Sequence, residues 1–235
     1  MTAPSPPQPP GAVRPTWTPE PLPEGGFGLT WQGRPLRSPE RRPLVLPNAA
    51  LAELVAEPCE KPPSGAQRLA FTAVDRVSET REATADEVAR FAGSDLLCYF
   101  AKAPEALVER QTAQWGRWLD WADAELGLPL VRTYGIAHTP QPPESLARAR
   151  ALALELDDFS LTGLAAATSL FGSAVLAFAL QRGALSGNAA FDLSRLDEAF
   201  QEERWGVDAE AAARAAALAG EAQLLDRWLR ACKSA

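Results

Sequence analysis

The feature that most constrains the fold of this chain is an uncharged stretch at residues 161–180, LTGLAAATSLFGSAVLAFAL. It is about as long as a membrane-crossing helix, but its threonines, serines, glycines and alanines make it less apolar than a typical span. Asp157 and Asp158 precede it and only Arg182 follows closely, so no basic cluster would fix an orientation across a bilayer. We therefore predict one central core helix here, with a membrane anchor as the alternative.

Composition limits the partners that this chain can have. A chain of 235 residues, 46% of them apolar, can bury a substantial core in one large domain or two modest ones. Its net charge of -7 argues against nucleic acid or anionic lipid as the main partner, because both bind basic surfaces. Cys59, Cys98 and Cys232 are too widely spaced for a disulfide framework or a zinc site, so we predict free thiols.

Two further features bear on catalysis and location. His138 is the single histidine, so a catalytic triad would have to use it and a multi-histidine metal centre cannot be built. It lies in a predicted loop, and we predict no catalytic residue, no metal and no cofactor. Residues 1–15 lack the apolar core of a signal peptide and the arginine-rich pattern of a transit peptide. Their prolines predict a disordered tail, and the predicted location is the cytoplasm.

Short apolar segments broken by turn residues predict a small antiparallel sheet within residues 17–47. Phe27, Leu29 and Trp31 occupy alternate positions, residues 32–33 suit a tight hairpin, and residues 44–46 predict a later strand. Helices are then predicted from an Asn48 cap through Glu57, over residues 68–77 and over residues 81–91, followed by a buried apolar patch at residues 95–100.

The rest of the chain predicts helices, apart from one extended piece at residues 129–136. Helices are expected over residues 104–126, 143–156, 161–180, 188–204 and 209–231. On the helix expected at residues 104–126, Trp115, Trp118 and Trp121 form one stripe. Such a stripe is typical of core packing, and a binding groove is the alternative. The predicted fold class is α+β. A small N-terminal α/β domain with an antiparallel sheet, residues 16–102, precedes an all-helical bundle domain, residues 103–235.

The most distinctive stretch of the chain is LDEAFQEERWG at residues 196–206. On a helix, one face would hold Glu198, Gln201 or Glu202, and Trp205. Leu196 and Phe200 would form an adjacent face that can pack on the central helix. The segment is thus predicted to present acidic side chains around an aromatic residue beside the core.

The carboxylates of this segment admit three interpretations. They belong to Asp197, Glu198, Glu202 and Glu203. A pair such as Glu198 and Glu202 could perform acid–base chemistry or bind a metal, although no nucleophile or cofactor motif lies nearby. A solvated helix face is the simplest interpretation. The third is a protein-binding site, with Trp205 as anchor and the carboxylates meeting lysine or arginine.

Several segments in a fixed order carry a family resemblance. They are GRPLRSPERRPLVLP, TAVDRV, DLLCYF followed by PEALVERQ and a tryptophan-rich helix, FGSAVLAFAL and LDEAFQEERWG. Between residues 27 and 229 the chain resembles the assembly chaperones of the F-type ATP synthase that are dedicated to its α subunit. Within that family it resembles a bacterial member. The family usually has a tryptophan after the first helix, where this chain has Glu57, Pro58, Cys59 and a shorter loop.

The resemblance implies a small α/β domain followed by an orthogonal helical bundle. It also implies a non-enzymatic cytoplasmic monomer that binds the free α subunit and shields its β-facing surface, without inserting into the membrane or binding nucleic acid. In that family the acidic helix is functionally sensitive, and the partner-binding residues expected here are Asp197, Glu198, Gln201, Glu202, Trp205 and Gly206. A generic adaptor with another client and a carboxylate-dependent enzyme using Glu198 and Glu202 are the alternatives.

Overall fold

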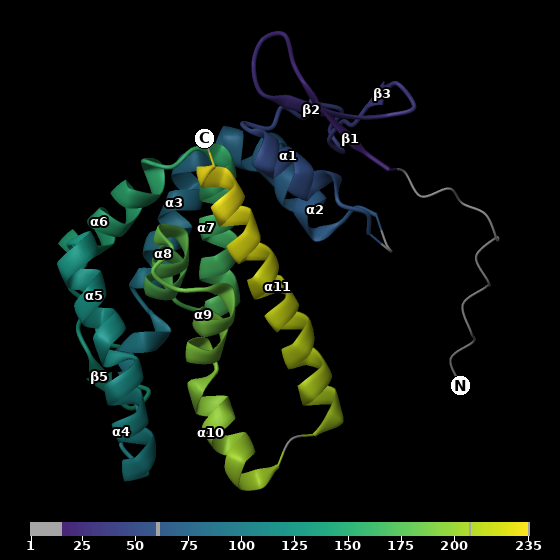
Figure 1. The fold of residues 1–235 in the computed structure, drawn as a ribbon. Helices are drawn as coiled ribbons and strands as arrows, with labels where there is room; N and C mark the ends of the chain where they lie inside the picture. Colours follow the sequence, from purple (N-terminus) through teal and green to yellow (C-terminus); the bar gives the residue numbers. More distant parts are fainter. Residues whose placement is uncertain (1–15, 60–61, 207, 235) are drawn as a thin grey trace.

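The N-terminal part of the molecule is built on a three-stranded antiparallel sheet (Figure 1). The computed structural model describes residues 16–59, 62–206 and 208–234, so the predicted tail at residues 1–15 lies outside the described residues. The strands are β1 (Thr18–Pro21), β2 (Phe27–Trp31) and β3 (Arg34–Pro35), in the order β1-β2-β3. Gln32 and Gly33 connect β2 to β3 with positive φ angles of 50° and 73°, as a tight primed turn requires. This hairpin confirms the prediction.

Two strand predictions need correction. Residues 44–46 form no strand of their own, and Leu46 joins the sheet only through an isolated bridge to Phe27. Pro43 and Pro47 flank this segment and have no N–H to donate, which limits further pairing. The extended piece at residues 129–136 shortens to β5 (Thr133–Tyr134), which pairs in parallel with β4 (Tyr99–Phe100).

Helices make up most of the remaining structure. In the first half they are α1 (Ala49–Ala56), α2 (Gly65–Thr72), the π-helical turn η1 (Ala73–Val77), α3 (Ser78–Ala92) and the 3-10 turn η2 (Leu96–Cys98). Asn48 caps α1 as predicted, because its side chain accepts a hydrogen bond of 2.8 Å from the N–H of Leu51. Two of the predicted helices, residues 68–77 and 81–91, instead form one nearly continuous run from α2 to α3 that is kinked at Thr80.

The second half of the chain is helical, as predicted. Its helices are α4 (Glu105–Gln114), α5 (Gly116–Leu126), α6 (Pro143–Leu154), α7 (Asp158–Phe171), α8 (Ala174–Arg182), α9 (Gly187–Ser194), α10 (Leu196–Trp205) and α11 (Ala209–Lys233). The fold class is therefore the predicted α+β, a small antiparallel sheet followed by a helical bundle (Figure 1). The domain boundary after residue 102 stays a prediction, and α3 packs across it against α6 and α7.

The central apolar stretch forms two helices, so the prediction of a single helix over residues 161–180 is wrong. Gly172 ends α7 in the left-handed conformation, with φ 63°, which favours a residue without Cβ. Ser173 then caps α8, its hydroxyl accepting a hydrogen bond of 3.1 Å from the N–H of Leu176. Every residue of α8 from Ala174 to Gln181 is buried, so the predicted core location is confirmed. Among the described residues, no helix is long and apolar enough to cross a membrane.

Two other predicted helices are also divided. The helix expected at residues 104–126 breaks at Trp115, where α4 ends and α5 begins. The helix expected at residues 188–204 breaks at Arg195, whose backbone leaves the helical region at φ -113° and ψ 20°. Gly116 follows the first break, whereas no glycine or proline adjoins the second. Trp115 and Arg195 themselves bond to Leu193 and Glu202. Trp115 is fully buried and Trp118 nearly so, which confirms the core interpretation of the tryptophan stripe.

Asp95 is a buried carboxyl that links η2 to the N-terminus of α8. Its oxygens accept hydrogen bonds of 3.0 Å from the N–H of Leu97 and 3.0 Å from the N–H of Val175. Burial raises the pKa of Asp95 to about 6, and the N–H donors, with Ser173, oppose that rise. The side chain therefore satisfies donors from two elements that are distant in sequence.

We expect Asp95→Ala to lower the free energy of unfolding by about 2–3 kcal/mol, because two buried N–H groups lose their acceptor. Urea denaturation followed by circular dichroism measures this loss. Asp95→Asn keeps one carbonyl acceptor and should cost about half as much. Equal losses in the two variants would contradict this role of the carboxyl oxygens.

Candidate partner-binding site

The acidic segment forms α10 and lies at the same end of the bundle as α4 (Figure 1). The predicted inner face is correct, since Leu196 and Phe200 are buried. Its neighbour differs from the prediction, because α10 packs chiefly against α4 and not against the central helices. The guanidinium carbons of Arg110 and Arg204 lie 5.2 Å and 4.3 Å from the centre of the Phe200 ring. Helix α4 therefore fixes how α10 is presented.

Asp197 is held by an internal hydrogen bond. Its carboxylate accepts a hydrogen bond of 2.7 Å from Nε2 of Gln111, a fully buried residue of α4. Oε1 of Gln111 accepts a hydrogen bond of 2.7 Å from the N–H of Ala101. Burial raises the pKa of Asp197, the Gln111 hydrogen bond lowers it, and the charge of Glu198 raises it. Asp197 thus joins α10 to α4.

Two more carboxylates of α10 are neutralised by arginines. Glu203 makes paired hydrogen bonds of 2.7 Å and 2.9 Å with Arg110 of α4. Glu202 lies 2.7 Å from the guanidinium of Arg195 in a partly buried ion pair. The charge of the predicted carboxylate cluster is therefore largely compensated within the molecule.

Glu198, Gln201 and Trp205 remain open to solvent on one face of α10. Among the described residues, no ion pair involves Glu198. The indole of Trp205 is 86% exposed, which is unusual for a large apolar side chain. These three residues line a groove of about 380 Å³ between α10 and the start of α11, together with Arg195, Glu202, Gly206 and Ala211. The predicted grouping of these side chains on one face is confirmed.

Comparisons with known proteins decide the family. The family model described as "ATP12 chaperone protein" matches residues 16–123. The crystal structure of Atp12 from Paracoccus denitrificans is 37% identical and has a TM-score of 0.86, with 94% of this chain and 97% of that chain covered. The chain belongs to the ATP12 chaperone family.

Other relatives agree with this assignment. A solved protein of Agrobacterium tumefaciens is 36% identical with a TM-score of 0.88, over 94% of this chain and 85% of that chain. The mitochondrial protein atp12 of Schizosaccharomyces pombe is 26% identical over an alignment of 222 residues, which covers 79% of this chain and 76% of the yeast protein. The expected membership of the assembly-chaperone family of the F-type ATP synthase is confirmed, and the bacterial relatives are consistent with a bacterial member. The protein is therefore an assembly chaperone of the F1-ATPase and not an enzyme.

Helix α10 ends at Gly206, its C-cap residue. Its backbone has φ 83° and ψ 166°, a region that is open essentially only to glycine. In the part of the chain that the structure describes, no atom beyond the two neighbouring residues lies within 4 Å of the position that a Cβ would take, so the requirement is conformational and not steric. Gly206 therefore shapes the turn that follows Trp205.

The same geometry opposes acid–base chemistry by Glu198 and Glu202. Arg195 holds Glu202 as an ion pair, whereas Glu198 is exposed and lines an open groove. A catalytic carboxyl pair needs two environments that push the pKa values apart, usually by burial. Within the described part of the chain, no group of three or more histidine, cysteine, aspartate or glutamate residues is arranged to hold a metal ion.

Sequence reasoning missed three residues that organise this site, Arg110, Gln111 and Arg195. Arg110 and Gln111 belong to the PEALVERQ segment, which contributes to the family resemblance without indicating its contacts. Their partners on α10 are 93 and 86 positions away. A polar residue such as Gln111 on the inner side of a helix is a signal of a buried hydrogen bond, but it does not identify the partner.

Gln111→Leu tests this link between α4 and α10. The change leaves the buried N–H of Ala101 and the half-buried Asp197 without their partner, and we expect a loss of about 2 kcal/mol in the free energy of unfolding at neutral pH. The pKa of Asp197 should rise further, because the hydrogen bond that lowers it is lost.

The pH dependence of that loss follows from the sign of the shift. A carboxyl whose folded pKa lies above its unfolded value destabilises the fold as pH rises through that pKa. Protonation at about pH 4 removes the unpaired charge, so the loss in Gln111→Leu should be smaller there than at about pH 7. Urea denaturation at the two pH values measures the difference. A larger loss at the lower pH would contradict the assignment.

Proposed function

We propose that this ATP12-family chaperone binds the free α subunit of the ATP synthase catalytic head. It shields the surface of the α subunit that later meets the β subunit and releases it during assembly. An isolated subunit of a ring exposes a large interface with apolar and charged parts, and such surfaces aggregate. We further propose that the protein acts as a monomer in the cytoplasm.

The observation that carries this proposal is that Glu198 lies exposed beside Trp205 without an ion pair to any described residue. The other carboxylates of α10 bond to Gln111, Arg195 or Arg110, whereas Glu198 has no ion pair among the described residues. An exposed tryptophan next to a free charge is a typical centre of a protein interface. Glu198 would meet a basic group of the α subunit, and Trp205 would pack against an apolar patch beside it.

The remaining predicted site residues support this face in different ways. Gln201 lines the groove and can donate or accept a hydrogen bond from the partner. Asp197 and Glu202 hold the helix and its neighbouring side chains in place, and Gly206 sets the turn after Trp205. Release needs no nucleotide in this scheme, because a tighter partner displaces the chaperone by mass action.

Co-expression tests the choice of client. Separately tagged α and β subunits from the same organism are produced with this protein, followed by pull-down and measurement of soluble α subunit. We expect selective recovery of the α subunit and less aggregate. Recovery of the β subunit in place of the α subunit would make the β subunit the client. If a folded chaperone recovers neither subunit, the proposed function is excluded.

A further inference from the structure

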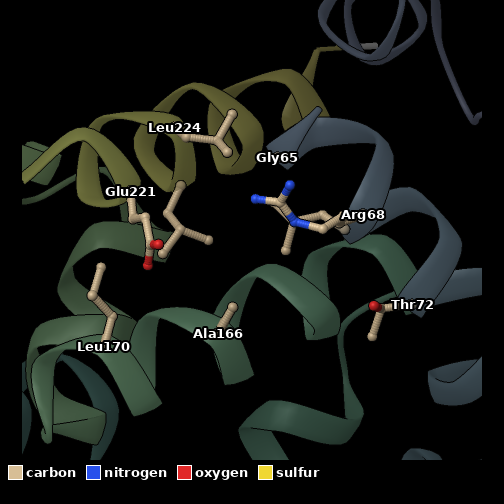
Figure 2. Close-up of a pocket in the computed structure, with 9 residues that line it drawn as sticks. Gly65, Arg68, Thr72, Ala166, Leu170, Glu221 and Leu224 are labelled. Atoms are coloured by element: carbon tan, nitrogen blue, oxygen red, sulfur yellow. The ribbon is translucent and has the colours of Figure 1, made fainter. Parts of the chain in front are cut away.

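A second recess lies between α2, α7 and α11, apart from the groove at α10. Its volume is about 240 Å³, and Leu69, Leu170, Leu224 and Leu225 form its apolar lining (Figure 2). Ligand pockets for whole small molecules start at about 300 Å³, so this recess suits a single large side chain better than a cofactor. The three helices come from sequence regions that are far apart, and a ligand here would contact all of them.

Two opposite charges flank this apolar recess. Figure 2 shows the guanidinium of Arg68 and the carboxylate of Glu221 turned toward the space between the helices. Arg68 donates a hydrogen bond of 3.0 Å to the carbonyl of Pro63, and within residues 16–59, 62–206 and 208–234 neither charge belongs to an ion pair. Both side chains are exposed. The recess therefore has, on either side of leucine side chains, a cation and an anion that no described residue pairs with.

Helices α2 and α11 are in contact at one end of this recess. Gly65, at the start of α2, approaches α11 so closely that a Cβ there would lie 2.3 Å from Cδ2 of Leu224. The side chain of Leu224 therefore closes this end of the recess against α2. Apolar surface left open beside such a contact is favourable to cover, because burial removes it from water.

We propose that this recess is a second contact for the client, and that it receives one large apolar side chain of the α subunit. An acidic group of the client would lie at Arg68 and a basic group at Glu221, which matches the apolar centre and charged rim of protein interfaces. This inference rests on the proposed function. It assigns a client contact to α2 and the middle of α11, beyond the acidic helix.

The two contacts lie on a common element. Ala211 lines the groove at α10 and Leu225 lines the recess, and both belong to α11. At 1.5 Å per residue, they are about 20 Å apart along the helix axis. Two weak contacts on one client strengthen each other, because the second one forms at a high effective concentration.

Charge reversal tests the recess without disturbing the core. Arg68→Glu, Glu221→Arg and the double variant are compared with the wild type for affinity to purified α subunit. We expect each single reversal to weaken binding by about tenfold, and the double variant to weaken it further, because both client charges stay unchanged. Asp123→Arg on α5 is the matched control, since Asp123 is also exposed. It should bind as the wild type does.

Filling the recess tests its apolar part. Ala166 lines it from α7, and Ala166→Phe places a ring where the client side chain would sit. Affinity should fall at least about tenfold while the circular dichroism spectrum and the cooperativity of unfolding stay unchanged.

The possible outcomes separate this inference from the proposed function. If the double variant binds the α subunit with full affinity, Arg68 and Glu221 only attract each other and the inference is overturned. Full affinity for the α subunit in all the recess variants would also overturn it. In both cases the proposed function stands if Glu198→Lys lowers the affinity for the α subunit by at least about 100-fold. A wild-type protein that does not bind the α subunit overturns both. Sedimentation could instead show that the wild type is a dimer and that the double variant is a monomer. The recess would then be occupied by a second copy of this chain, which also overturns the inference.

Discussion

Glu198→Lys should lower the affinity for the free α subunit by at least about 100-fold, which corresponds to about 2.7 kcal/mol, and leave the fold intact. Glu198 is exposed and has no ion pair among the described residues, so the structure of the chaperone does not depend on its charge. In the complex the new lysine would face a basic group of the client. The two positive charges would repel each other and would both lose their hydration, whereas Glu198 attracts the basic group in the wild type. Isothermal titration calorimetry with purified α subunit measures the change.

Asp192→Lys is the matched control for this charge reversal. Asp192 is exposed on α9, and no ion pair links it to the described residues. Its reversal changes the net charge by the same amount and should alter the affinity by less than about threefold, because Asp192 does not line the groove at α10. Equal loss in both variants would mean that only the net charge matters, and undiminished binding by Glu198→Lys would refute the site.

Trp115→Ala should lower the free energy of unfolding by about 4 kcal/mol, the largest loss of stability that we expect from a single substitution here. The indole is fully buried, and its ring packs edge-on against Phe100 with 6.0 Å between ring centroids. Its Nε1 donates a hydrogen bond of 2.9 Å to the carbonyl of Leu193. The substitution therefore leaves a cavity and a buried carbonyl without its donor.

Trp205→Ala removes the same side chain from an exposed position and provides the comparison. It should change the free energy of unfolding by less than about 0.5 kcal/mol, because little of that indole is buried. Guanidinium denaturation monitored by circular dichroism gives both values. Similar losses in the two variants would mean that the junction of α4 and α5 does not have the buried position described above.

Trp115 contributes both to the stability of the bundle and to the position of α10, which carries the proposed binding site. Leu193 lies in the last turn of α9, two residues before Arg195, where the chain enters α10. The hydrogen bond from Trp115 thus fixes the start of the acidic helix from the α4–α5 junction. Trp115→Phe should keep most of the packing but lose this hydrogen bond, at a cost of about 1–2 kcal/mol.

The charges of α10 show how the structure narrows the set of predicted site residues. Placement on a helix predicts which side chains share a face, and Glu198 and Trp205 do lie together with Gln201. It does not predict which carboxylates are already paired. Arg110 and Arg195 neutralise two of them and Gln111 binds a third, so the free acidic group of the predicted set is Glu198.

Local features were predictable from the sequence because the groups that make them are neighbours in the chain. Asn48 caps α1, Asp157 caps α7, and Gln32 and Gly33 form the turn of the hairpin. Each of these depends on a side chain and a backbone group at most three residues apart, or on a preferred backbone conformation. The α+β class and the buried position of residues 161–180 followed in the same way from apolar patterning.

Tertiary contacts decided where the long helices break and which carboxylate stays free. Arg195 pairs with Glu202 across the break before α10, Trp115 bonds to Leu193, and Gln111 bonds to Asp197 from 86 residues away. A residue of ordinary helix propensity shows no local sign of such a contact, because the partner is brought near only when the bundle packs. The sequence by itself determined the family, the fold class and the face of α10 that carries Glu198 and Trp205. Only the tertiary structure decided that Glu198 has no ion pair with any described residue, since charge compensation depends on groups that meet through packing.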